Sequence, residues 1–287
     1  MTAKETKAPR NLEHSTRSSS SFQLIWHNSR IIVGFITLFG AVLRIYHLGY
    51  KPLWFDEAAL YMIAKGNFQE VIQQNALGNS APPTFAVLLS LMMMMGDSKF
   101  NLRLISCIAG ILAIPSIYFL SRQFLPKSSS YFCSLLLAIS QQQIAYSQQV
   151  REYSVAFTLA TLTIALFYKY LRDPIWQNWS LMTILFVVGV FTQYGLALLI
   201  LSLSLVWLYS LVVDKEKSAE QRKRIVVWWL GSQICVLVAA IAVYFVSLRY
   251  QMKSGGFGAS SNFNYLSSGY WDGSTSSFFK LAFNNTK

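Results

Sequence analysis

The stretch Trp179–Val213, WSLMTILFVVGVFTQYGLALLILSLSLVWLYSLVV, decides the fold class of this 287-residue chain. It contains no charged residue. A helix crosses the hydrocarbon core of a bilayer with about twenty apolar residues, and this stretch is long enough for two such spans. Polar Gln193 and Tyr194, followed by Gly195, interrupt the apolar run and predict a tight turn between the two spans.

Other apolar runs predict further spans, at Ile31–Leu48, Leu104–Leu120, Tyr131–Tyr146, Val155–Tyr170 and Ile225–Leu248. The run Pro82–Met95 is shorter and suits a thin span, a re-entrant segment or an interfacial helix. We therefore predict an all-α, polytopic transmembrane helical bundle of about 7–8 membrane segments.

Composition supports a membrane protein and excludes other classes. Hydrophobic residues make up 54% of the chain and charged residues 13%, whereas soluble domains carry about 25% charged residues. The net charge of +12 is spread over short basic clusters between apolar runs, which does not resemble a nucleic-acid-binding stripe. Cys107, Cys133 and Cys235 lie inside apolar runs, so we expect neither a disulfide nor a metal site from them.

The basic clusters predict the orientation, because Lys and Arg gather in cytoplasmic loops. The N-terminal tail and the loops 121–129, 171–178 and 214–224 are expected in the cytoplasm. If the chain is bacterial, the membrane is expected to be the plasma membrane. The spans alternate cleanly from residue 104 onward. Before residue 104 the alternation fails. Either the segment 82–95 does not cross the membrane fully, or one short basic loop lies outside against the positive-inside rule.

The chain divides into three predicted parts. Residues 1–30 are expected to form a disordered cytoplasmic tail and residues 31–250 a transmembrane module. Its outer loop, 49–81, contains an amphipathic segment that we expect to lie along the membrane surface. Residues 251–287 are expected to begin a further outer loop of a longer protein.

Acidic side chains outside the cytoplasmic clusters are few, and the pair Asp56-Glu57 follows the first span directly. Asp56 suits a helix N-cap and Glu57 the first turn of that helix. A carboxylate on such a loop also suits a general base or a ligand for a hydrated cation. Both residues are therefore candidates for catalysis.

A second candidate region is the polar turn Tyr146–Tyr153, with Gln148 and Arg151 between its two tyrosines. A guanidinium can donate two hydrogen bonds to a phosphate, and tyrosines can stack on a sugar or form an aromatic belt. Snorkelling to the interface is the competing interpretation for Arg151. It is also the simpler one for Arg44 and Arg103, which could otherwise bind phosphate. The break at Gln193 and Tyr194 suggests a polar cavity.

These pieces occur in the order found in one superfamily. Arg44-Ile-Tyr-His-Leu-Gly49, Trp54-Phe-Asp-Glu-Ala58, Pro82-Pro83, Arg103-Leu-Ile-Ser106, Tyr118-Phe-Leu-Ser-Arg122 and Tyr146-Ser-Gln-Gln-Val-Arg-Glu-Tyr153 together resemble the GT-C membrane glycosyltransferases. The resemblance is to the branch of the protein O-mannosyltransferases and lipid A aminoarabinose transferases.

The resemblance implies an inverting enzyme that takes a sugar from a polyprenyl-phosphate donor on the outer face. Asp56 would be the catalytic carboxylate, accompanied by Glu57. The resemblance puts Arg151 by the donor site. From their positions in the sequence we add further candidate donor-binding residues: Tyr153, Tyr146, Gln148, Arg103, Gln193 and Tyr194. A divalent cation is possible but no metal site is expected, since Ser80 and Ala81 precede the Pro pair where some members carry a charged residue or His. The acceptor could be a protein, a lipid or a glycan.

Two other classes of function remain open. A transporter or flippase of lipid-linked substrates would show an internal repeat and broken helices at the bilayer midplane. Only the break near Gly195 fits that pattern. A non-catalytic membrane assembly subunit would fit the short chain.

Overall fold

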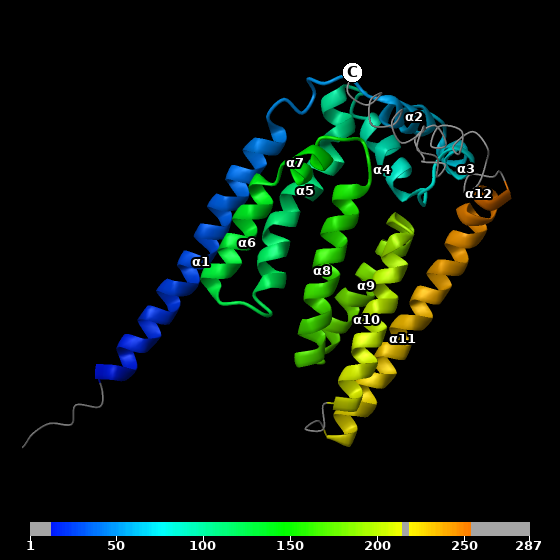
Figure 1. The fold of residues 1–287 in the computed structure, drawn as a ribbon. Helices are drawn as coiled ribbons and strands as arrows, with labels where there is room; N and C mark the ends of the chain where they lie inside the picture. The colour runs from blue at the N-terminus through cyan, green and yellow to red at the C-terminus, as the bar shows by residue number, and fades with distance from the viewer. Residues whose placement is uncertain (1–12, 214–217, 254–287) are drawn as a thin grey trace, which may run out of the picture.

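The computed structural model describes residues 13–213 and 218–253, with side chains from residue 29 onward. Every regular element in this part is a helix (Figure 1). In chain order the helices are α1 (Glu13–Ile45), α2 (Phe55–Ala64), α3 (Phe68–Gly78), α4 (Thr84–Met93), α5 (Lys99–Ser121), α6 (Lys127–Ile139), α7 (Gln141–Ser147), α8 (Tyr153–Arg172), α9 (Trp176–Thr192), α10 (Gly195–Val213), α11 (Ala219–Val243), the π-helix η1 (Tyr244–Leu248) and α12 (Arg249–Lys253).

Four helical stretches of the described residues are long and apolar enough to cross a membrane. They are α5, α8, α10 and the continuous stretch Ala219–Lys253 that comprises α11, η1 and α12. Large apolar side chains on their outer faces, such as Leu112, Leu205 and Leu237, stay exposed, as lipid-facing side chains do. The prediction of an all-α membrane bundle is confirmed.

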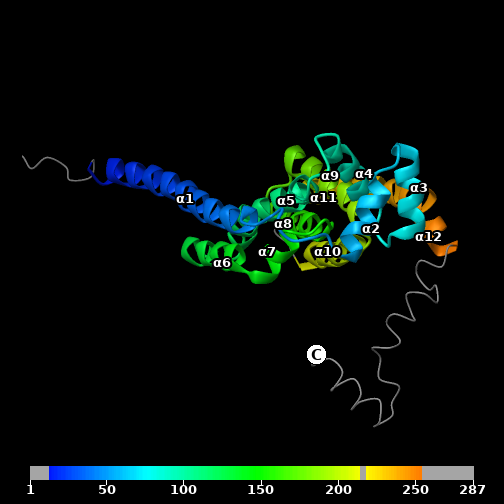
Figure 2. The ribbon, with the colours of Figure 1, turned by 90° about the horizontal axis from the view of Figure 1, so that it is seen from above.

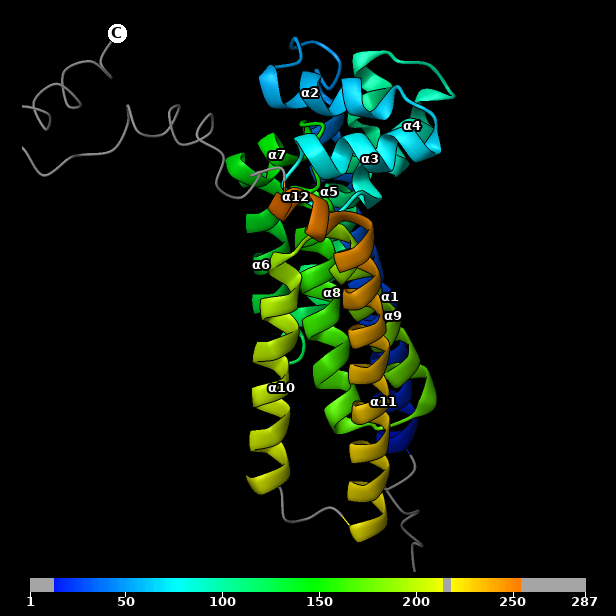
Figure 3. The same cartoon turned by 90° about the vertical axis from the view of Figure 1, so that its right-hand side faces the viewer.

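The bundle has two different ends. The short helices α2 and α3 lie across one end, with α4, α7 and α12 beside them, and we call α2–α4 the cap (Figures 1 and 3). The loops between α5 and α6 and between α8 and α9, the end of α10 and the start of α11 lie at the opposite end. Seen from above, α1 and α6 extend to one side of the remaining helices (Figure 2).

Small residues let the bundle helices approach closely. Gly110 of α5 faces Ser147 of α7, and an added Cβ would overlap the Ser147 hydroxyl. Thr158 of α8 donates a hydrogen bond to the carbonyl of Ala109 on α5, 2.8 Å away. Small and hydroxyl-bearing residues commonly fill helix interfaces in membranes for this reason. The larger core is formed by the four helices from α8 to α11. In it, Phe186 of α9 and Trp207 of α10 pack on Trp229 of α11.

The cap has a core of its own, and α4 belongs to it. Phe85 and Leu89 of α4 pack with Leu60 of α2 and Val71 of α3. At about 1.5 Å per residue, the ten residues of α4 are about half the length that a bilayer core requires. Of the two alternatives, the structure therefore supports the one in which 82–95 does not cross.

Tyr131–Tyr146 is not one continuous helix, so that prediction is wrong. The helix stops at Ile139, Ser140 is extended, and the Ser140 hydroxyl accepts the amide hydrogen of Gln143 at the start of α7. The guanidinium of fully buried Arg44 donates to the carbonyls of Leu137 and Ala138 at 3.1 and 3.0 Å. A cation stabilises a helix C-terminus in this way, so Arg44 neither snorkels nor faces a head group.

The tail also differs from expectation within the described residues. Helix α1 begins at Glu13, so the backbone of residues 13–30 continues the first predicted span as a helix. Extending an existing helix is far easier than nucleating a new one. Residues 1–12, 214–217 and 254–287, with most of the predicted C-terminal outer loop, lie outside the described residues.

Candidate active site

The first turn of α2 presents two adjacent carboxylates in different environments. Trp54 is the N-cap residue, and its amide donates to Glu57 Oε2 at 3.2 Å. The N-cap residue is thus Trp54, and not Asp56 as predicted, and the Glu57 carboxylate accepts its backbone N–H. The Asp56 side chain is 56% exposed, whereas Glu57 is 1% exposed. Successive helix residues point about 100° apart, which sends one inward and the other outward.

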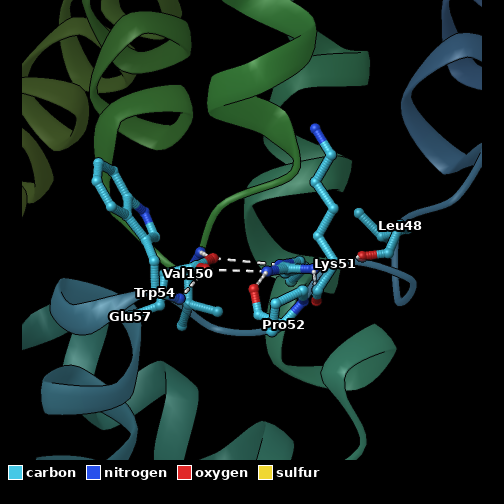
Figure 4. A network of polar contacts seen from close by, with 7 residues as sticks. Leu48, Lys51, Pro52, Trp54, Glu57 and Val150 are labelled. Carbon is cyan, nitrogen blue, oxygen red and sulfur yellow. Dashed lines mark hydrogen bonds and ion pairs between the residues drawn. The ribbon is translucent and has the colours of Figure 1, made fainter. Parts of the chain in front are cut away.

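Glu57 forms a buried ion pair with Arg103 of α5 (Figure 4). Arg103 Nη2 lies 2.9 Å from Glu57 Oε2, and Nε lies 3.2 Å from Oε1. The other three N–H groups of Arg103 donate to the carbonyls of Leu48, Lys51 and Pro52 at 3.0–3.1 Å. All five donors of the guanidinium are therefore used inside the protein.

Two predicted site roles conflict with this geometry. Glu57 also accepts the amide hydrogen of Val150 at 2.7 Å, so each of its oxygens already accepts two hydrogen bonds. Glu57 could not take a proton from a substrate without losing one of these hydrogen bonds. Arg103 likewise could not bind a donor phosphate without losing one of its own. These contacts favour a structural role for both residues over the predicted catalytic role of Glu57 and the predicted phosphate-binding role of Arg103.

The loop that carries Arg151 is held from both sides. Glu57 binds the amide of Val150, and the hydroxyl of Ser106 on α5 donates to the carbonyl of Arg151 at 2.8 Å. The Gln148 amide group donates to the carbonyls of Arg44 and Tyr46 at 3.0 and 2.8 Å. Gln148 is therefore occupied at the end of α1, and its predicted contact with a donor would compete with these bonds.

Asp56 and Arg151 meet at one cavity of about 280 Å³. Asp56 Oδ2 lies 3.8 Å from Arg151 Nη2, which is ion-pair distance but longer than a hydrogen bond. Asn79 and Ser80, from the α3–α4 loop, line the same cavity. The structure thus brings together the two side chains that the sequence singled out on different segments.

The two predicted tyrosines lie next to each other and Tyr153 lies beside Arg151, but neither tyrosine lines the cavity. Tyr146 and Tyr153 have ring centroids 5.3 Å apart, and the Arg151 guanidinium lies 5.6 Å from the Tyr153 ring centroid. Burial alone would lower the pKa of Arg151, but the Tyr153 hydroxyl and the carboxylates of Glu152 and Asp56 outweigh it and raise the pKa. Arg151 is therefore a permanent and largely buried positive charge at the cavity.

Gln193 and Tyr194 do not line this cavity. They occupy the α9–α10 turn, and the Tyr194 hydroxyl donates to Gln251 Oε1 at 2.9 Å. No sequence pattern pointed to Gln251, because its contacts depend on how distant helices assemble. Among the described residues, no group of three or more His, Cys, Asp or Glu side chains could hold a metal ion.

A larger apolar groove lies beside the polar cavity. Its volume is about 660 Å³, and it runs between α3 and the η1–α12 end of the last helical stretch. Phe68, Ile72 and Phe245 line it. Leu77 lines both the groove and the polar cavity, so the two are neighbours.

The apolar helical bundle is that of an integral membrane protein, and a carboxylate and a guanidinium line a polar cavity at one of its ends. The family model described as dolichyl-phosphate-mannose-protein mannosyltransferase matches residues 80–245. The match covers more than half of the chain, so the chain belongs to this family, and it is a membrane glycosyltransferase of the GT-C type. No curated protein matches the chain.

The match has a limit that matters for the site. It includes Arg151 but begins after Asp56. The assignment of Asp56 therefore rests on its place in the cavity and on the resemblance of the segment Trp54–Ala58, independently of the family match.

Proposed function

We propose that this chain moves a sugar from a polyprenyl-phosphate donor to an acceptor at the cap end of the bundle, with Asp56 as the general base. The proposal rests chiefly on one observation: Asp56 and Arg151, from segments far apart in the sequence, line the same cavity 3.8 Å from each other. The buried Glu57 network drawn in Figure 4 supports both segments, because Glu57 belongs to α2 next to Asp56 and binds the amide of Val150 next to Arg151.

The chemistry needs a base on one side of the anomeric carbon. The Asp56 carboxylate would remove the proton of the acceptor hydroxyl as its oxygen attacks that carbon. The bond between the anomeric carbon and the phosphate oxygen breaks, and polyprenyl phosphate leaves with the bonding electrons. A single displacement of this kind inverts the anomeric centre. The high exposure of Asp56 leaves its carboxylate accessible to an acceptor.

The leaving phosphate needs a cation on the opposite side of the anomeric carbon, so the Asp56–Arg151 ion pair, 3.8 Å apart in the structure, would open when the donor binds. Negative charge develops on the bridging phosphate oxygen as the bond breaks, and a fixed guanidinium stabilises it. Arg151 supplies this charge, since its backbone is pinned by Ser106 and its side chain lies beside Tyr153. The Tyr146–Tyr153 pair offers a face on which the sugar can stack.

The carrier lipid needs an apolar surface next to the phosphate site. The groove between α3 and η1–α12 shares Leu77 with the polar cavity, and apolar side chains dominate its lining. We therefore assign it to the isoprenoid chain of the donor. The description of the matching family, which names a dolichyl phosphate, supports the same class of donor.

The cap end would face outward from the cell. The loops with the basic clusters lie at the opposite end, and such loops remain in the cytoplasm. This orientation puts the N-terminus inside and residues 31–250 in the membrane module. The cap then lies on the outer membrane surface, where exposed Trp54, Phe55 and Phe68 can enter the interface.

The direct test uses the full chain in proteoliposomes, with a short-chain polyprenyl-phosphate mannose as donor and a Ser/Thr-rich peptide as acceptor. We expect release of polyprenyl phosphate and a product of inverted anomeric configuration. Parallel assays with EDTA and with added Mg²⁺ test whether a divalent cation takes part. Movement of intact donor across the bilayer without cleavage would contradict the proposal and favour a transporter.

A further inference from the structure

The last helical stretch changes its geometry as it reaches the cap. After α11 it continues as the π-helix Tyr244–Leu248 and ends as α12. A π-turn holds one residue more than an α-turn, so it changes the direction of the side chains that follow, and such turns often occur at functional sites. Ser247 within the π-helix and Gln251 beyond it are fully buried, at 0% and 1% exposure. Both η1 and α12 contact α3 (Figure 3).

Gln251 connects three parts of the molecule. Its Oε1 accepts a hydrogen bond from the Tyr194 hydroxyl of the α9–α10 turn at 2.9 Å. Its Nε2 donates to the carbonyl oxygens of Asn79 and Ala81 at 2.8 and 3.2 Å, and lies 3.1 Å from Ser247 Oγ. The side chain thus joins the last helix to the α3–α4 loop, whose residues are far away in the sequence.

That loop is also held by α3. Asn75 donates its side-chain amide to the carbonyl of Ala81 at 2.9 Å, and its Oδ1 accepts from the side chain of Asn79 at 2.9 Å. Between these anchors, Asn79 and Ser80 line the cavity that contains Asp56 and Arg151. One wall of the cavity is therefore supported from behind by Gln251.

We propose that Tyr194 and Gln251 are positioning residues, which fix the 79–81 loop so that the cavity fits the sugar phosphate of the donor. This rests on the proposed function. It goes beyond the family match, because Gln251 lies after its last residue, 245. Neither residue lines the cavity, so each acts through the loop.

The direction of the hydrogen bonds supports the arrangement. Burial raises the pKa of Tyr194, so its hydroxyl keeps its proton and remains a donor to Gln251. The oxygen of Gln251 is then the acceptor, which leaves its NH₂ group to face the two loop carbonyls. A glutamate at this position could accept from Tyr194 but could not donate to Asn79 and Ala81.

The test compares variants of the full chain in nanodiscs by two measurements that need no turnover. Hydrogen–deuterium exchange reports the protection of residues 78–82, and tryptophan fluorescence reports the Kd of short-chain polyprenyl-phosphate mannose. The variants are Gln251→Ala, Gln251→Glu and the milder Tyr194→Phe. Met252→Ala is the matched control, since Met252 is 61% exposed on the same short helix.

We expect faster exchange at 78–82 and a roughly 3- to 10-fold higher Kd in the three variants, the effect of one or two lost hydrogen bonds. Met252→Ala should leave both unchanged. Unchanged exchange would overturn the inference, as would an unchanged Kd with faster exchange. A wild-type chain that binds the donor without transferring it would refute the proposed function alone. No donor binding by the wild type would refute both.

Discussion

Asp56 and Glu57 are neighbours with the same functional group and opposite environments. The Glu57 carboxylate accepts four hydrogen bonds in a buried site, whereas Asp56 is exposed beside Arg151. A buried carboxylate with a buried guanidinium fixes structure but leaves no free lone pair for a substrate. The two residues therefore have different roles. Glu57 holds the start of α2 and the loop of Val150 in place, and Asp56 lines the cavity.

Breaking the Glu57–Arg103 pair is expected to destabilise the protein. Glu57→Gln leaves the buried Arg103 charge uncompensated, and such a change costs about 3–5 kcal/mol. We expect a clearly lower melting temperature in detergent. The double variant Glu57→Gln/Arg103→Met should recover part of the loss, because it removes the unpaired charge. A single variant as stable as the wild type would contradict the structural role.

Replacement of Arg151 by Lys is expected to weaken the donor site while preserving the fold. Lysine keeps the charge but cannot donate two parallel hydrogen bonds to a phosphate. We expect a roughly 10-fold or greater rise in the donor KM, the scale of about 1.4 kcal/mol. Arg122→Lys, at the opposite end of the bundle, is the control. Equal kinetics for both variants and the wild type would remove Arg151 from the site.

The sequence was informative about residue types but not about their contacts. Asp56 and Arg151 could be singled out because charged side chains are rare in the segments predicted to lie on the outer side, away from the basic loops. Glu57 and Arg103 were assigned to the site because no local pattern reveals that they pair across 46 positions. Such pairings are decided by the topology of the whole bundle, which also explains why Gln251 was missed.

At the scale of elements, close helix packing depends on small side chains at single positions. A methyl group added at Gly110 would overlap the Ser147 hydroxyl and lie 2.8 Å from its Cβ. Arg44 Nε would lie 3.3 Å from the same methyl group. The contact between α5 and α7 therefore leaves no room for a larger residue.

Gly110→Ala is accordingly expected to destabilise the protein by about 1–3 kcal/mol, the usual cost of overpacking. Thermal unfolding in detergent measures the effect. Gly34→Ala, where an added Cβ meets nothing within 4 Å, is the matched control and should cost little or slightly stabilise α1. A Gly110→Ala protein as stable as this control would show that α7 lies farther from α5.

The lengths of the apolar runs predicted the long helices well, because a helix must have about twenty apolar residues to cross the hydrocarbon core. They did not predict the interruption at Ser140, where Arg44 from another helix stabilises the freed carbonyls. Neither could they place α4, because an apolar segment of ten residues fits a soluble-like core as well as a membrane. In both cases tertiary contacts overrode the local pattern.

The whole molecule has a basic end and a cap end, and this polarity can be tested by labelling. Single cysteines in a background without Cys107, Cys133 and Cys235 react with a membrane-impermeant maleimide from one side only. We expect Ser80→Cys and Asp97→Cys, on either side of α4, to react from outside. Lys127→Cys should react only after permeabilisation. Opposite labelling of the first two would show that α4 crosses the membrane.

The central claim concerns one carboxylate, and turnover of Asp56→Asn tests it most directly. The exposed side chain should tolerate this isosteric change, so the melting temperature should equal that of the wild type. Loss of a general base should lower the release of polyprenyl phosphate from polyprenyl-phosphate mannose by about 10²–10⁴-fold. Turnover equal to that of the wild type in a stably folded Asp56→Asn protein would contradict the account.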